Sequence, residues 1–245
     1  MSARATAMDR RDLHLYEPSL VVGRDDRDAQ GRLRPEHLEA VCRVLQDRGF
    51  VLLPSDTAYS IAAWLRTERT RDAINRMLQR PDEPISLAFP SVAVVQRWTT
   101  RNTVADRLLE RFTPGPITVV RPASRLVPAD LTNKAFHSQN RTIGVRIPNS
   151  VEERQVAGAT GNPVTTVAVR NLTSEAPVTS FAEAVDIVRA GIATIGGAPW
   201  CAIEGEIRYQ RHSTVVEVLG DDGDYRLIRP GSIPEEEIRD CIEER

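Results

Sequence analysis

The stretch FVLLPSDTAYSIAA, residues 50–63, joins a core-type strand directly to a group of polar side chains. The four apolar residues 50–53 predict a buried strand, because a short continuous apolar run is typical of strands with both faces covered. The run ends at Pro54 and continues into Ser-Asp-Thr at 55–57. Ligands of open α/β sheets bind in the crevice beyond the strand ends. The three polar residues therefore either line such a crevice or form an ordinary turn held by side-chain hydrogen bonds.

Helical and strand patterns alternate along the rest of the chain. The expected helices cover 35–49, 70–80, 104–112, 180–191 and 234–244, and the expected strands cover 50–53, 85–89, 117–120, 142–147, 164–169, 192–197, 213–218 and 225–231. Interleaved helices and strands favour an α/β fold with a twisted mixed sheet. We expect a polar arm over 1–34 and one domain over 35–245.

Composition excludes several classes of protein. The chain has 245 residues, 41% of them hydrophobic, and a formal net charge of −2. Such a charge gives no global attraction to nucleic acid or anionic membranes, so any anion site must come from local arginines. No apolar run approaches the roughly 18 residues of a membrane span. The three cysteines are odd in number and far apart, which argues against disulfides and cysteine-bound zinc and suits a reducing cytoplasm.

Seven polar motifs follow one another where strands are expected to begin or end. They are PSDTAY (54–59), QRPDEP (79–84), TPGPIT (113–118), VRIP (145–148), VRNLTSEAP (169–177), RHSTVVEV (211–218) and IRPGSI (228–233). Each motif alone is compatible with a turn or the start of a strand. In this order and spacing they resemble the YrdC-like family, and the resemblance covers about residues 36–238.

The resemblance implies a fold and an activity. The expected fold is a single-domain α/β YrdC-like structure, a twisted mixed open sheet with flanking helices and a concave, positively charged groove. The expected activity is synthesis of L-threonylcarbamoyladenylate from L-threonine, bicarbonate and ATP, with release of pyrophosphate. Mg²⁺ would offset the triphosphate charge. The product feeds the t6A modification of tRNA, and the expected location is the cytoplasm.

The resemblance also implies which residues form the site. Arg80 and Arg146 are expected to be catalytic, facing phosphate and carboxylate groups, because a guanidinium presents a planar fork to such anions. The residues expected to bind substrate or nucleotide are Ser55, Thr57, Tyr59, Thr118, Arg170, Asn171, Ser213 and Arg229. No residue is expected to bind a metal.

The chain departs from the family pattern mainly on the triphosphate side. Leu78 stands where the family has a lysine, and it extends the apolar face of a helix. Val169 replaces a serine hydroxyl, while the neighbouring Arg170 either replaces the lost positive charge or remains in solvent. Ser60 and the pair 173–174 occupy positions where the family has glycine or Ser-Gly.

These departures leave two alternatives to threonylcarbamoyladenylate synthesis. One is a divergent paralogue that acts on another amino acid or carbamoyl compound. The other is a non-catalytic module that binds nucleotide or RNA, although the net charge and the lack of interleaved aromatic residues weaken that hypothesis. The sequence does not indicate the oligomeric state.

Overall fold

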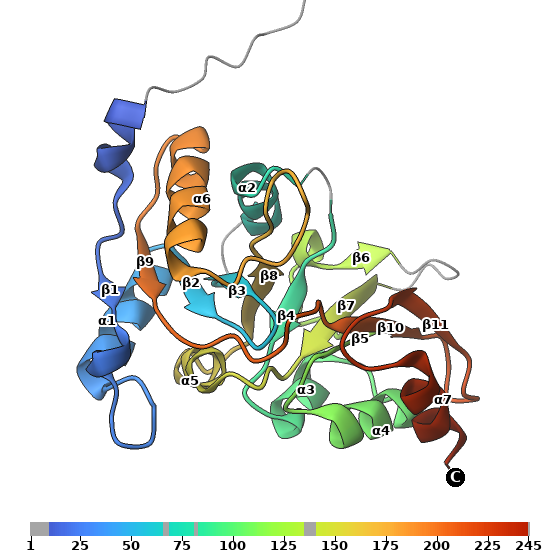
Figure 1. Ribbon diagram of the computed structural model, residues 1–245. Coiled ribbons are helices and arrows are strands. Elements are labelled where there is room, and N and C mark those ends of the chain that lie inside the picture. Colours follow the sequence, from blue (N-terminus) through green and yellow to red (C-terminus); the bar gives the residue numbers. More distant parts are fainter. Residues whose placement is uncertain (1–9, 66–68, 81–82, 135–140, 245) are drawn as a thin grey trace, which may run out of the picture.

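The computed structural model describes residues 10–65, 69–80, 83–134 and 141–244 (Figure 1). Over these residues the chain forms one mixed sheet flanked by helices, which confirms the expected α/β class. None of the helices in these ranges is long and apolar enough to cross a membrane.

An eleven-stranded sheet runs through this part of the chain. In spatial order its strands are β1 (Val21–Val22), β9 (Trp200–Ile203), β2 (Phe50–Pro54), β3 (Tyr59–Ala63), β8 (Val164–Ala168), β4 (Ser86–Ala88), β7 (Arg141–Arg146), β5 (Ile117–Pro122), β10 (Thr214–Val218) and β11 (Tyr225–Arg229), with β6 (Asn133–Lys134) paired to β7. Parallel and antiparallel pairs alternate irregularly. For example, β2 is antiparallel to β3 and parallel to β9.

Seven α-helices and three short 3₁₀ helices accompany the sheet in the same ranges. They are α1 (Pro35–Gln46), α2 (Thr70–Met77), α3 (Val92–Trp98), α4 (Thr103–Phe112), α5 (Val151–Ala159), α6 (Phe181–Thr194), α7 (Glu235–Glu243), η1 (Arg10–Tyr16), η2 (Arg24–Asp26) and η3 (Ala129–Leu131). Helices α2 and α6 cover one face of the β2 half of the sheet, and α1 and α5 cover its other face. Helices α3, α4 and α7 pack on the β5 half (Figure 1).

Strand β2 explains the apolar run that opens the sequence analysis. Phe50 and Leu52 belong to the core beneath α2 and α6, whereas Val51 and Leu53 belong to the core beneath α1 and α5. Because successive side chains of a strand point to opposite faces, a strand covered on both sides needs apolar residues at every position. The predicted buried strand is therefore confirmed.

The β5 half of the sheet is apolar on one face only. Ile117, Val119 and Val145 pack against α3, α4 and α7. The alternate residues Thr118 and Arg146 therefore point to the opposite face. Thr118 and Arg146 thus place buried polar side chains on the face opposite this apolar core.

One strand prediction is wrong. The segment 192–197 is not a strand, because α6 continues to Thr194 and a turn follows. Gly196 and Gly197 have φ of +85° and +95°, a left-handed conformation that ends helices and that glycine adopts without strain. The sequence analysis also missed the strands β1, β3, β6 and β9 and the helices α3 and α5.

The segment expected to be a polar arm packs against the domain where the structure describes it. Val22 and Leu33 are buried in the core, and β1 pairs with β9. The indole Nε1 of Trp200 donates a hydrogen bond to the carbonyl of Tyr16 (2.9 Å). A few apolar residues thus attach an otherwise charged segment to the edge of the sheet.

Candidate functional site

A buried ion pair joins the loop after β2 to the end of β7. Arg146 donates from Nη2 to Asp56 Oδ1 and from Nη1 to Thr57 Oγ1 (3.5 Å). Asp56 Oδ2 accepts a hydrogen bond from the backbone N–H of Asn149 (2.9 Å). Asp56 is fully buried, so the tripeptide 55–57 is more than a solvent-exposed turn. Its carboxylate fixes the direction of the Arg146 guanidinium.

Two further arginines share the carboxylate of Glu83. Arg80 donates to Glu83 Oε2 from Nε (3.0 Å) and Nη2 (2.7 Å). Arg170 approaches the same carboxylate, with its Nη2 3.2 Å from Oε2. The side chain of Arg170 is therefore held in an ion pair, which excludes the expectation of an arginine lying free in solvent.

A third group joins β5, β10 and β11. The hydroxyl oxygens of Thr118 and Ser213 lie 3.0 Å apart, and both residues are buried. Arg229 donates from Nη2 to the carbonyl oxygen and the hydroxyl of Ser213, both at 3.0 Å. This arrangement places two hydroxyls beside a guanidinium.

Electrostatic effects show that the three groups lie together. Burial, and after it the charges of Arg170, Arg146 and Arg80, together lower the pKa of Arg229 to about 10, while the charge of Glu83 opposes them. Burial likewise lowers the pKa of Arg80. Four arginines from distant parts of the sequence therefore converge in one region, which is the arrangement expected of an anion-binding site.

His212 faces the same positive charges. Burial lowers its pKa, and Arg229, Arg170 and Arg146 add to the effect. The imidazole is therefore neutral at neutral pH. The sequence analysis did not select His212, and its position directly before Ser213 was the only available signal.

Two predicted site residues use their side chains in contacts with groups other than the arginines. Tyr59 is buried in the core, its ring centroid 5.7 Å from that of Phe181, and its hydroxyl both donates to and accepts from the backbone of Gly205. Asn171 uses its side chain to close a turn: Oδ1 accepts from the N–H groups of 173 and 174, and Nδ2 donates to Glu183. Both side chains thus shape the surroundings of the site.

The two main departures from the family pattern are core residues. Leu78 is 5% exposed and packs with Ile74 and Met77. Val169 is fully buried in the same core. Neither side chain adds a polar group to the arginine region. A third departure, Ser60, is also buried and lies within β3.

Glu153 is a buried carboxylate that sequence reasoning missed. It lies on α5, and burial raises its pKa to about 7 against the opposing charge of Arg146. Neither carboxylate oxygen makes a well-formed hydrogen bond within the described ranges, although the hydroxyls of Ser55 and Thr166 lie close enough to lower the pKa. Glu153 therefore lies close enough to Arg146 and Asp56 to interact electrostatically with both.

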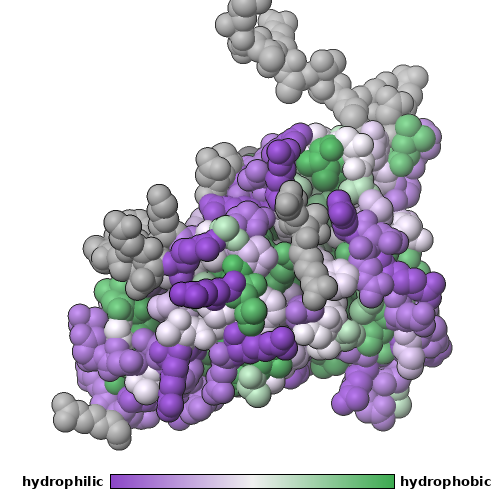
Figure 2. Space-filling model, turned by 180° about the vertical axis from the view of Figure 1, so that it is seen from behind, coloured by the Kyte–Doolittle hydropathy of each residue, from purple (hydrophilic) through white to green (hydrophobic). Residues whose placement is uncertain are grey.

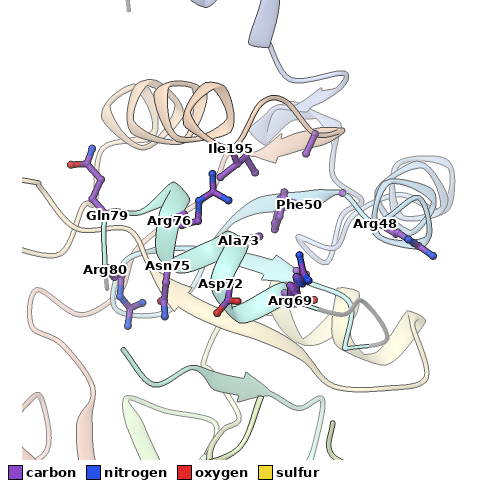
Figure 3. Close-up of a pocket in the computed structure, with 14 residues that line it drawn as sticks. Arg48, Phe50, Arg69, Asp72, Ala73, Asn75, Arg76, Gln79, Arg80 and Ile195 are labelled. Carbon is purple, nitrogen blue, oxygen red and sulfur yellow. The ribbon is translucent and has the colours of Figure 1, made fainter. Parts of the chain in front are cut away.

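A cavity of about 840 Å³ lies between α2, the beginning of β2 and the end of α6 (Figure 3). Phe50, Ala73 and Ile195 line it, with Arg69 and Arg76 around them. Phe50 begins β2, whereas Asp56 follows the other end of that strand. Arg80 belongs both to this lining and to the arginine region, so the cavity adjoins the candidate site at that residue.

The surface seen from behind is a mosaic of hydrophilic residues and smaller hydrophobic areas (Figure 2). No group of three or more potential metal-ligating side chains was found among the described residues. The site is therefore defined by arginines and hydroxyls, a set suited to binding anions that carry phosphate or carboxylate groups.

The described part of the chain is thus a mixed α/β protein in which four arginines converge beside the sheet. The chain belongs to the Sua5/YciO/YrdC family, because the family model described as "Telomere recombination" matches residues 43–231. The mouse threonylcarbamoyl-AMP synthase is 29% identical over 197 residues, which cover 80% of this chain and 67% of that protein. A putative threonylcarbamoyl-AMP synthase of Methanocaldococcus jannaschii is 23% identical over 209 residues, which cover 85% of this chain and 92% of that protein.

Solved structures support the same fold. The Pyrococcus abyssi protein Sua5 complexed with L-threonine matches with a TM-score of 0.74 at 22% identity, covering 92% of this chain. This chain spans 62% of the length of that protein. Escherichia coli YciO matches with a TM-score of 0.70 at 20% identity, covering 86% of this chain and 94% of its own. At these identities the likeness establishes the fold.

Proposed function

We propose that this protein is a nucleotidyltransferase that forms threonylcarbamoyl-AMP from L-threonine, bicarbonate and ATP, releasing pyrophosphate. The convergence of Arg80, Arg146, Arg170 and Arg229 is the observation that carries the proposal. The names of the curated relatives support it. The product would serve the t6A modification of tRNA.

The arginines would bind the triphosphate. Guanidinium groups form paired hydrogen bonds to phosphate oxygens and keep their charge when buried. Arg146 is already oriented by Asp56, so little reorganisation is needed when the ligand binds. Arg170 would supply the cation that Leu78 does not.

The hydroxyl pair would bind the amino acid. Thr118 and Ser213 can each donate and accept a hydrogen bond, which suits the side-chain hydroxyl of threonine. Arg229 lies against Ser213, where it would face the threonine carboxylate or the carbamate that replaces its amine. The amino acid and the nucleotide would thus meet at Arg229.

The chemistry needs positioning more than covalent help. The unprotonated amine of threonine attacks bicarbonate to give a carbamate and water. A carbamate oxygen then attacks the α-phosphorus of ATP, the bond to the β-phosphate breaks, and pyrophosphate leaves. Preorganised positive charge stabilises the charge that develops at phosphorus. The threonine ammonium loses its proton to solvent before the amine attacks, and the neutral His212 adds no further positive charge to the site.

Mg²⁺ would arrive with the nucleotide. Mg²⁺ in nucleotide sites is commonly held by substrate phosphates and one or two carboxylates. The described residues offer no cluster of three ligands, which is compatible with binding of this kind. The ion would offset part of the triphosphate charge.

A second candidate is the same reaction with another amino acid or a carbamoyl compound. Leu78 and Val169 lie in the core, and Glu83 adds a negative charge beside two of the arginines. The two apolar side chains and the Glu83 carboxylate would change which polar groups surround the ligand. A change of substrate would be one consequence.

Pyrophosphate release with ATP and bicarbonate tests both candidates when it is measured across a panel of amino acids. Turnover that requires threonine supports the first candidate, and turnover with another compound supports the second. Arg229→Ala should weaken ATP binding at least tenfold, since a charged hydrogen bond is worth about 1.5–3 kcal/mol. Arg239→Ala, at an exposed position on α7, is the matched control. Absence of turnover with every compound tested, together with absence of ATP binding, would contradict both.

A further inference from the structure

Glu83 lies across two of the four converging arginines. Its Oε2 accepts hydrogen bonds from Arg80 Nε and Nη2, and it is 3.2 Å from Arg170 Nη2. Its Oε1 is 3.4 Å from Arg170 Nη1. Both carboxylate oxygens therefore engage guanidinium groups, in the way a ligand carboxylate or phosphate would.

Two hydrogen bonds hold the backbone at Glu83 in place. Asn75, near the end of α2, donates from Nδ2 to the carbonyl of Glu83 (3.0 Å). Arg80 also donates from Nη2 to the carbonyl of Pro84 (3.2 Å). The backbone of residues 83 and 84 is thereby tied to α2 and to Arg80. The ion pair between Arg80 and Glu83 is local, because the two residues are three positions apart in the sequence.

The carboxylate side chain can move more easily than its partners. Glu83 is 36% exposed at its side chain, whereas Arg80 is 10% exposed. Solvent can therefore stabilise a carboxylate that has swung away, while the buried Arg80 remains where it is. Solvent therefore offsets part of the cost of displacing the Glu83 carboxylate, and the incoming phosphate replaces it as the partner of the buried Arg80.

The charge of Glu83 also acts beyond its direct partners. It opposes the lowering of the pKa of Arg80 and, at longer range, that of Arg229. Removing the charge would make the region more positive at three of its four arginines. Any anion that binds there works against the potential that Glu83 creates.

We propose that Glu83 is an internal competitor for the anion site, filling the position between Arg80 and Arg170 until a phosphate group displaces it. The proposal rests on the proposed function only in taking the incoming anion to be a phosphate of a nucleotide or pyrophosphate. A phosphate that carries two or more negative charges binds Arg80 and Arg170 more strongly than the singly charged Glu83 carboxylate does, and displaces it. Chloride and acetate carry a single charge and do not displace it. Glu83 thus selects ligands by charge.

Pyrophosphate is a suitable probe because it binds without any chemical step. Isothermal titration of wild type and Glu83→Gln should show binding about tenfold tighter in the variant, in the absence of Mg²⁺. Glutamine keeps the size of the side chain and removes the charge. Glu36→Gln, at an exposed position on α1, should match the wild type. Melting temperatures should be equal within a few degrees, which confirms that the variants fold.

A second measurement tests whether the gain passes through the neutralised arginines. In an Arg170→Gln background, Glu83→Gln should produce a smaller gain than in the wild type, because one of the two partners is absent. An equal gain in both backgrounds would show a general electrostatic effect and would overturn the specific competition.

The outcomes separate this proposal from the proposed function. If wild type and Glu83→Gln bind pyrophosphate equally, or the variant binds it more weakly, the competition is refuted. Weaker binding would instead mark Glu83 as a contact to the ligand. If the variant binds more tightly but neither protein turns over threonine, the proposed function alone fails. If neither protein binds pyrophosphate or ATP, both fail.

Discussion

Asp56 and Arg146 form an ion pair in which both side chains are buried, although the residues are 90 positions apart in the sequence. The pair connects the loop after β2 to the end of β7, strands that three others separate in the sheet. A buried charge is costly unless it is paired, so each residue depends on the other. The pair therefore belongs both to the fold and to the candidate site.

Asp56→Asn should lower the free energy of unfolding by about 3–5 kcal/mol, because it leaves Arg146 as an unpaired buried charge. Urea denaturation measures this change. The double variant Asp56→Asn/Arg146→Met should lose less than the sum of the single losses, since the unpaired charge is gone. Asp240→Asn, on the exposed side of α7, is the control. Additive losses in the double variant would show that the pair is not coupled.

Glu153 makes stability depend on pH. Its pKa is about 7 in the folded protein and 4.5 for an ordinary glutamate. The folded state holds the proton more tightly, so the stabilisation is fully present below pH 4.5 and is lost as the pH rises towards 7. The loss should not exceed about 3 kcal/mol, from 1.36 kcal/mol for each pKa unit.

Glu153→Gln should remove most of that dependence. The neutral side chain avoids burying a charge, so the variant should be more stable than the wild type at pH 8 and similar to it at pH 4.5. Melting curves between these pH values, for wild type and variant, provide the measurement. The interpretation fails if the two proteins show parallel pH profiles. Arg146, Asp56, Ser55 and Thr166 face the carboxyl and remain unchanged in the variant.

Leu78→Lys tests whether the family lysine can be restored. Leu78 packs in the core, so we expect the variant to lose at least about 2 kcal/mol of stability without tighter ATP binding. Gln79→Lys, at the exposed neighbouring position, is the control for added charge. Melting temperature and ATP affinity are measured on the same samples. A gain in affinity would show that the lysine reaches the arginine region.

Thr118→Val should raise the KM for the amino acid roughly fivefold, because it removes a hydroxyl worth about 1 kcal/mol. Thr118→Ser keeps the hydroxyl that lies 3.0 Å from Ser213 and should restore the wild-type KM. Steady-state pyrophosphate release at varied threonine provides both constants. If serine and valine behave alike, the hydroxyl has no part in substrate binding.

Two neighbouring residues of β1 test the contribution of the N-terminal segment. Val22 is fully buried and Val21 is 49% exposed. Val22→Ala should therefore cost about 2 kcal/mol, at about 0.8 kcal/mol for each buried methylene, whereas Val21→Ala should have little effect. Chemical denaturation of both variants checks this. Equal, small effects would show that the segment does not stabilise the domain.

The sequence was most informative where periodicity and burial coincide. The apolar run of β2 and the N-cap Ser180 of α6, whose hydroxyl accepts from the N–H of Glu183, follow from local rules. Local rules did not predict the packing of the N-terminal segment, because the few residues that reach the core, such as Val22, are dispersed among charged residues. Composition alone could not distinguish it from a free arm.

The site was only partly predictable for a similar reason. Motif order located Arg80, Arg146 and Arg229, but it could not show which partner each guanidinium chooses. Glu83 looks like a surface residue in the sequence, and its contacts with Arg80 and Arg170 become visible only in the folded structure. Glu153 is adjacent to another glutamate on a weakly amphipathic helix, so no pattern shows which of the two is buried.

The candidate site takes its residues from strands that span the sheet from β2 to β11, eight neighbours in spatial order. No single hairpin or helix pair contains enough of it to bind an anion. Ligand binding should therefore protect distant amides together, so that hydrogen exchange slows in β2 and in β11 alike when nucleotide is added. Ligand binding would therefore show that the strands from β2 to β11 are folded together.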